Sequence, residues 1–175
     1  CLVYSFGSSN QFDFEEAVLK EIGPHCEIHA FDHTVGPNPS RKPTTVNFHP
    51  WGMTGGVTTN GTGALGTGIH TLDRIVSALG HWDRQISIFK IDVEGTEFNT
   101  LPALLQQGVF NKLRIQQVLL EVHKNTPAKI HELFSAFRQA GYVIFHKEPN
   151  IQFPLSSHDV CSEYSFIRVG KSFWN

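Results

Sequence analysis

The sequence has little net charge, few cysteines and no long hydrophobic run. Its 14 basic and 16 acidic residues leave a formal net charge of −2, and without a block of like charge it has no electrostatic footprint for nucleic acid. The longest uncharged run, Pro43 to Leu72, is filled with glycine, threonine and asparagine, whose irregular backbone a bilayer would leave unsatisfied. We therefore expect no nucleic-acid partner and no transmembrane segment.

The three cysteines, Cys1, Cys26 and Cys161, show no CxxC or Cys/His spacing, so a structural zinc site is not expected. Their odd number excludes complete pairing within the chain. Three free thiols are the favoured interpretation, because free cysteine packs as a small hydrophobic residue. One disulfide with a spare thiol is the alternative.

The 175 residues, 40% of them hydrophobic, are enough for one domain with its own core, spanning residues 1–175. The chain opens inside an apparent strand without an initiator methionine, so we expect it to be a piece of a longer protein. Its compartment, cytosol or secretory lumen, and its oligomeric state stay open.

Short apolar runs alternate with segments of helical period, which predicts an α/β fold with a largely parallel sheet. Because no helical pattern separates the last two strands, we expect them to form an antiparallel hairpin. The predicted strands are Cys1–Phe6, Cys26–Phe31, Thr45–Phe48, Ile86–Ile91, Gln116–Val122, Tyr142–His146 and Tyr164–Val169.

Four helices are predicted between these strands. They begin near Asp13, at Thr71, after Gly95 and at Thr126, and end at Gly23, Leu79, about Gln106 and Gly141. Asp13 and Glu16 have the spacing of a capping box, and Pro102 is expected in the first turn of the third helix.

Residues 52–68 contain seven glycines. A flexible surface loop is the favoured interpretation over a phosphate-binding loop, because no lysine follows at the spacing of a P-loop.

Polar residues follow four of the predicted strands. Ligands of open parallel sheets bind beyond the carboxyl ends of the strands, so these residues mark the expected site. They are Gly7 to Asn10, Asp32, the pair Asp92 and Glu94, and the pair Glu121 and His123.

Asp32 stands 25 residues after Gly7. A carboxylate at the end of the second strand can accept both hydroxyls of a ribose, although a lone acidic residue there is also a common turn former. The first strand is not followed by a complete GxGxxG pattern, so a nucleoside cofactor without phosphates is favoured.

The segment Phe89 to Glu97, FKIDVEGTE, resembles the signature of FkbM-type S-adenosylmethionine-dependent methyltransferases, and Thr71-Leu72-Asp73 resembles the segment that precedes it. Val3 to Asn10 with Phe12 to Glu16 is similar to the group of animal and algal proteins related to methyltransferase-like protein 24. The resemblance covers Cys1 to His123.

This resemblance implies a class I methyltransferase, Rossmann-like sheet of about seven strands, mostly parallel with the last antiparallel, and helices on both faces. It implies S-adenosylmethionine as cofactor, with Gly7, Ser8 and Asn10 against its methionine part. Asp32 would lie on the ribose, and Asp92 beside the amine or the transferred methyl. Ser5 departs from the usual acidic residue and Gln11 from a usual glycine.

For a hydroxyl acceptor a base must remove the proton. His123 is the first candidate, because its ordinary pKa is near neutrality, and Glu121 lies on the same face of the strand. Glu94 is an alternative base, or a ligand of a divalent cation with Asp92 and Glu121, although no metal is favoured. Trp51 is a candidate surface for adenine, or an ordinary core residue.

The sequence therefore predicts an S-adenosylmethionine-dependent methyltransferase acting on an oxygen of a small molecule or sugar. A non-catalytic binding or assembly module with the same fold is one alternative. Methylation of RNA or protein is another, which would require a basic face.

Overall fold

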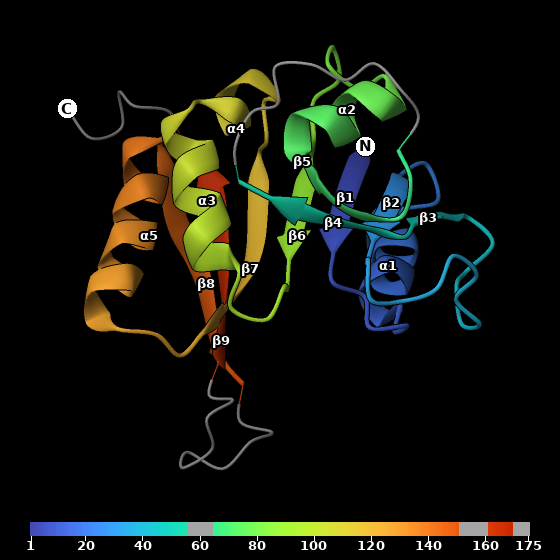
Figure 1. The fold of residues 1–175 in the computed structure, drawn as a ribbon, viewed down its shortest axis with the longest axis horizontal. Coiled ribbons are helices and arrows are strands. Elements are labelled where there is room, and N and C mark those ends of the chain that lie inside the picture. Colours follow the sequence, from blue (N-terminus) through green and yellow to red (C-terminus); the bar gives the residue numbers. More distant parts are fainter. Residues whose placement is uncertain (56–64, 151–160, 170–175) are drawn as a thin grey trace.

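A seven-stranded sheet forms the centre of the computed structural model, which describes residues 1–55, 65–150 and 161–169 (Figure 1). The strand order is β3-β2-β1-β6-β7-β9-β8. β9 pairs antiparallel with both β7 and β8, whereas the other neighbouring strands pair in parallel. The bounds are β1 Leu2–Phe6, β2 Glu27–Phe31, β3 Val46–His49, β6 Ile88–Ile91, β7 Gln117–His123, β8 Tyr142–Pro149 and β9 Cys161–Arg168. The predicted α/β class and the mostly parallel sheet are confirmed.

Helices cover both faces of the sheet, as predicted. Successive strand residues point to opposite faces, so Tyr4 packs into the larger core and Val3 into the smaller one. The smaller core lies under α1 and the π-helical turn η1, whereas the larger core takes its residues from the other helices. The bounds are α1 Asp13–Ala17, η1 Val18–Ile22, α2 Leu72–Leu79, α3 Glu97–Gln106, α4 Val109–Lys112 and α5 Pro127–Gln139.

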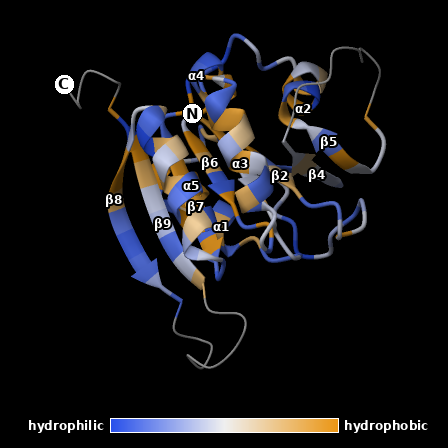
Figure 2. Ribbon diagram, turned by 60° about the vertical axis from the view of Figure 1, so that its left-hand side comes forward, coloured by the Kyte–Doolittle hydropathy of each residue, from blue (hydrophilic) through white to orange (hydrophobic). Residues whose placement is uncertain are grey.

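Hydropathy follows this arrangement. Figure 2 shows hydrophobic residues along the central strands and a largely hydrophilic β8 at the sheet edge. In the part of the chain that the structure describes, no helix is both long and apolar enough to span a membrane.

The glycine-rich segment departs from the predicted loop. Trp51–Thr54 forms β4 and Gly68–Thr71 forms β5, and the two pair in parallel as a separate two-stranded sheet. The loop prediction was wrong for these flanks, because β-pairing between segments so far apart leaves no local sequence signal. Its middle, 56–64, lies outside the described residues.

The cysteines also differ from the favoured expectation of three free thiols. Cys1 and Cys26 form a disulfide, and Cys161 is a buried free thiol, which is the alternative arrangement. The physical reason is strand register: Leu2 pairs with Glu27 in the parallel β1–β2 ladder. The residues just before these two are therefore neighbours across the ladder.

Two local helix predictions were wrong. The N-cap of α1 is Phe12, and Asp13 makes no capping hydrogen bond because it already lies inside the helix. Pro102 is the sixth residue of α3, beyond its first turn. There it cannot donate to the Phe98 carbonyl, but it is buried together with Leu101 and Leu104, and this packing offsets the lost bond.

Candidate functional site

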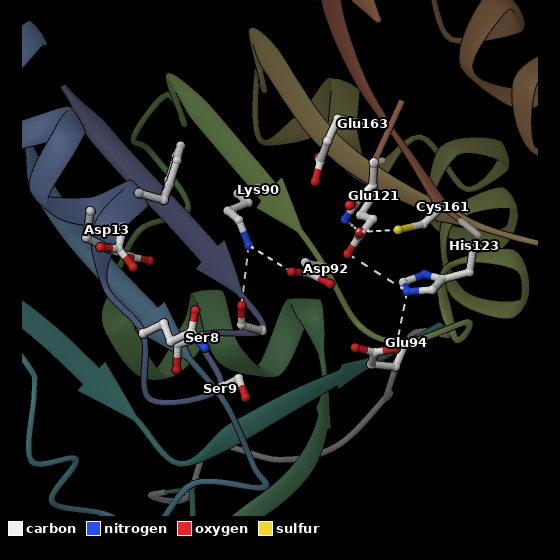
Figure 3. A pocket seen from close by; sticks show the side chains of 15 residues that line it. Ser8, Ser9, Asp13, Lys90, Asp92, Glu94, Glu121, His123, Cys161 and Glu163 are labelled. Carbon is white, nitrogen blue, oxygen red and sulfur yellow. Dashed lines mark hydrogen bonds and ion pairs between the residues drawn. The ribbon is translucent and has the colours of Figure 1, made fainter. Parts of the chain in front are cut away.

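A cavity of about 590 Å³ opens at the carboxyl ends of β1, β6 and β7 (Figure 3). Its lining is strongly acidic: six carboxylates face two basic side chains among the described residues that form it. The carboxylates are those of Asp13, Glu15, Asp92, Glu94, Glu121 and Glu163, and the basic side chains are Lys90 and His123.

A second cavity of about 260 Å³ adjoins the first, and most of its surface is apolar, with Phe31, Met53 and Ile69 among the residues that line it. Asp32 and Asp92 both line it. One cofactor could contact both only if they shared a cavity in this way. Gly7, Ser9, Asp92 and Glu94 line both cavities. The two cavities therefore adjoin, with these residues as their common wall.

Gly7 forms the narrow point between the ends of β1 and β6. Its φ is +85°, a left-handed conformation that favours glycine, and a Cβ at this position would overlap the Asp92 carbonyl. Any side chain would therefore both strain the backbone and push the two strand ends apart.

Asp32 holds the loop that follows Gly7. Its Oδ2 accepts hydrogen bonds from the Ser8 and Ser9 backbone N–H groups, at 3.0 and 2.7 Å. Its Oδ1 accepts from the Thr34 N–H and hydroxyl, at 2.9 and 2.6 Å. Burial works to raise the pKa of Asp32, but these bonds hold it below its usual value. The carboxylate thus fixes a loop whose residues Ser9 and Asn10 adopt positive φ angles.

Asp92 and Glu121 form a carboxylate pair across the ends of β6 and β7. Burial, and then the hydrogen bond with Glu121, raise the pKa of Asp92 to about 7. Burial acts on Glu121 in the same direction, but hydrogen bonds from Asp92, Cys161 and Asn150 hold its pKa below the ordinary value. Near neutral pH the pair therefore gains or loses one shared proton.

Lys90 provides a fixed positive charge beside this pair. Its Nζ lies 3.3 Å from the Gly7 carbonyl oxygen and 3.5 Å from Asp92 Oδ2. It also lies 5.9 Å from the centre of the Phe14 ring.

His123 lies among three carboxylates. Its Nδ1 is 3.2 Å from Glu97 Oε1, and its Nε2 is 3.2 Å from Glu94 Oε2 and 3.8 Å from Glu121 Oε2. The hydrogen bond with Glu97, followed by the charges of Glu97, Glu121 and Glu94, raises the pKa of His123 to about 9. The imidazole is therefore protonated at neutral pH. The prediction of His123 as a base assumed an ordinary pKa near neutrality, and that assumption does not hold here.

We predict that replacing His123 with glutamine makes stability less dependent on pH. A raised folded-state pKa contributes stability that is complete below the unfolded value of 6.5 and is lost as pH rises through about 9. The advantage of the native chain over His123→Gln should shrink by up to about 3 kcal/mol over this range. Urea unfolding at several pH values measures this difference, with His131→Gln, at an exposed position of α5, as control. A pH-independent difference would contradict the charged assignment.

The structure brings most of the predicted site residues together. Gly7, Ser8, Asp92, Glu94, Glu121 and His123 line the first cavity, and Asp32 lines the second. Asn10 and Trp51 line neither. The Asn10 side chain donates to Ser40 Oγ at 3.4 Å, and the Trp51 ring stacks on His49 with centroids 4.4 Å apart.

Sequence reasoning assigned no role to Glu97 or Lys90. Glu97 is fully buried, and its Oε1 accepts from both the backbone N–H and Nδ1 of His123. Glu97 stands in the FKIDVEGTE segment, but only the fold shows that its carboxylate reaches the end of β7.

Comparison with known proteins gives a family and a fold. Residues 1–168 match the family model described as "Methyltransferase domain". A comparison with curated proteins found no match.

Three solved structures share the fold at low sequence identity. A Pyrococcus horikoshii protein provisionally assigned as an RNA methyltransferase is 13% identical, with a TM-score of 0.52 over 97% of this chain and 75% of that one. A Lactococcus lactis protein provisionally assigned as a hemolysin is 14% identical, with a TM-score of 0.54 over 98% of this chain and 79% of that one. TrmK of M. capricolum, in complex with S-adenosyl-homocysteine, is 9% identical, with a TM-score of 0.53 over 96% of this chain and 62% of that one.

Proposed function

Because this chain belongs to the family of methyltransferase domains, we propose that it binds S-adenosylmethionine across the two cavities and methylates a small-molecule acceptor. The single observation that carries the proposal is the pair of adjoining cavities at the strand ends, in which Gly7 and Asp92 stand between an acidic cavity and a more apolar one. We also propose that the chain is FkbM-like, because of the resemblance of Phe89 to Glu97. The proposed relation to methyltransferase-like protein 24 rests on Val3 to Glu16.

The residues present fit this cofactor. The apolar walls of the second cavity, Phe31, Met53 and Val93, suit a purine, and Asp32 lies where a ribose would meet the end of β2. Asp92, with Gly7 and Ser8, suits the amino-acid part, since a carboxylate attracts an ammonium group. Asn10 would act by fixing the loop after β1 through its bond to Ser40. Trp51 would act by packing against Phe31, which lines the second cavity.

The hydrogen-bond donors around Asp32 refine its role. A carboxylate has about four lone-pair sites, and the Ser8, Ser9 and Thr34 groups already use them. We infer that Asp32 chiefly fixes the loop on which the cofactor lies, and that a ribose hydroxyl would share one of its oxygens.

The variant Asp32→Asn tests this role. An amide in place of the carboxylate sets an N–H group against N–H donors, so the loop should rearrange. We expect affinity for S-adenosylhomocysteine to fall at least tenfold by calorimetric titration, about 1.4 kcal/mol or more. Asp83→Asn, outside both cavities, is the matched control. Unchanged affinity of Asp32→Asn would contradict the role.

S-adenosylmethionine supplies an electrophilic methyl group on a sulfonium, and the protein's task is chiefly alignment, which can contribute about 7–11 kcal/mol. We propose that the pair Asp92 and Glu121 receives the proton of the acceptor hydroxyl, because the pair titrates near neutrality. His123 holds the Glu121 and Glu94 carboxylates in place as their counter-ion. Glu94, 85% exposed, lies at the mouth, where it can contact the acceptor.

The lining charges favour a neutral or cationic acceptor. Six carboxylates would repel the phosphates of RNA, and Lys90 already contacts Gly7 and Asp92. We therefore propose a small molecule or sugar that carries a hydroxyl group as the acceptor, rather than a nucleic acid.

The test combines binding and turnover. Calorimetry should show one site for S-adenosylmethionine and for S-adenosylhomocysteine, and transfer of labelled methyl groups should occur with members of a panel of alcohols and sugars. Binding without transfer to any small molecule, RNA or protein in the panel would favour a non-catalytic module. No binding of either nucleoside would remove the proposal.

A further inference from the structure

A second group of ligand-type side chains lies at the amino end of β2, remote from the two cavities. Glu27 is the first residue of β2 and Asp32 follows its last, so along a strand rising 3.3 Å per residue they are about 16 Å apart. Glu27 Oε1 lies 2.8 Å from His29 Nε2 and 3.5 Å from His81 Nε2. The three ligand atoms all lie within 4.8 Å of one another. We propose that Glu27, His29 and His81 form a zinc-binding site.

The donor set and spacing match zinc. Two imidazole nitrogens and one carboxylate oxygen are a known zinc combination, with bonds of about 2.0–2.2 Å. Tetrahedral ligands at such bond lengths stand about 3.3 Å apart, close to the two separations above. Both histidines are only 7% exposed, whereas Glu27 is 38% exposed. The site therefore has two buried ligands and one side open for a water molecule as fourth ligand.

Each ligand is oriented through its other polar atom, as metal ligands in proteins usually are. His81 Nδ1 lies 2.8 Å from the Tyr4 hydroxyl, and His29 Nδ1 lies 2.9 Å from His49 Nε2. Glu27 Oε2 accepts from Arg84 at 2.6 Å.

The electrostatics also suit a cation. A carboxylate only accepts, so His29 Nε2 carries a proton toward Glu27 Oε1 in the structure, and zinc would displace this proton to Nδ1, which faces His49 Nε2. The Arg84 guanidinium, 3.3 Å from His81 Nε2, shows that this nitrogen accepts rather than donates. Arg84 is 40% exposed, so it can move toward solvent when a metal ion takes its place while keeping its bond to Glu27 Oε2.

Zinc here would connect two parts of the chain that no disulfide joins. His81 directly follows the Gly80 C-cap of α2, whereas the other two ligands lie on β2. One ion would thus link the end of α2 to the sheet, at a place separate from the proposed site of methyl transfer.

The experiment measures zinc directly on untagged protein. Elemental analysis after dialysis against zinc, and competition with a chromophoric chelator, should show one tightly held ion per chain. Cobalt(II) substitution should give the visible bands of a four-coordinate ion. Glu27→Gln, at a half-exposed position that should not disturb folding, should weaken binding at least tenfold, and His29→Gln with His81→Gln should abolish it.

Two controls separate this site from others. The double variant Cys1→Ser, Cys26→Ser removes the group of Cys1, His25 and Cys26, which could bind zinc only with its disulfide reduced, and should keep its zinc, as should His70→Gln. Circular dichroism establishes that each variant is folded. A folded native chain that binds no stoichiometric zinc, or zinc lost in the cysteine variant but retained without His29 and His81, would overturn the proposal.

Discussion

Replacing Gly7 with alanine is expected to destabilise the protein at the carboxyl ends of β1 and β6 and to abolish cofactor binding. The added methyl group would overlap the Asp92 carbonyl, and the backbone angle of +85° is unfavourable for alanine. We expect a loss of about 3–5 kcal/mol in the free energy of unfolding, or about 10 °C in Tm. Thermal unfolding with and without S-adenosylhomocysteine measures both effects, because a ligand that binds only the folded chain raises Tm.

Gly36→Ala is the matched control, since a Cβ there meets nothing within 4 Å. It should behave as the native chain, with the same Tm and the same ligand-induced shift. A stable Gly7→Ala chain that still binds the ligand would show that the β1 and β6 ends can separate without harm. That result would contradict the packing argument on which the site shared by the two cavities depends.

Removing the proton acceptor is expected to give the largest kinetic effect. Glu121→Gln keeps the shape of the side chain and its place beside His123 but cannot take a proton. With an acceptor found in the panel, kcat should fall by about 10²–10⁴, the usual contribution of general acid-base catalysis. The dissociation constant for S-adenosylhomocysteine should change less than threefold, because the loss concerns the reaction and not the cofactor.

The pH profile gives an independent reading of the same pair. In the native chain, kcat/KM should rise with pH and level off above about 7, the value near which Asp92 and Glu121 together lose their proton in the ligand-free protein. Glu121→Gln should lack this rise. Glu148→Gln, 72% exposed on β8, is the control and should retain it. A full rate in Glu121→Gln would exclude this carboxylate as the base.

The sequence predicted the elements that carry strong local patterns. The buried strand before Asp92 and the helix that begins at Thr126 were both located to within about two residues. At the second of these, the Thr126 side chain accepts from the Lys129 N–H, as its sequence position suggests. The ends of the strands follow from the same apolar patterns, so the acidic residues at those ends could be predicted from the sequence.

What could not be predicted depends on contacts between distant segments. The parallel pairing of β4 and β5, and the disulfide between Cys1 and Cys26, follow from register across a ladder and not from spacing along the chain. The same holds for charge states. His123 was expected to titrate near neutrality, but Glu97, 26 residues away, shifts its equilibrium toward the protonated form.

The most direct test is a crystal structure of the chain with S-adenosylhomocysteine. The account predicts one ligand that crosses the narrow point at Gly7, with its purine among Phe31, Met53 and Val93 and its amino-acid part beside Asp92. The ligand at any other place on the sheet, or confined to one cavity with the Gly7 passage closed, would contradict it.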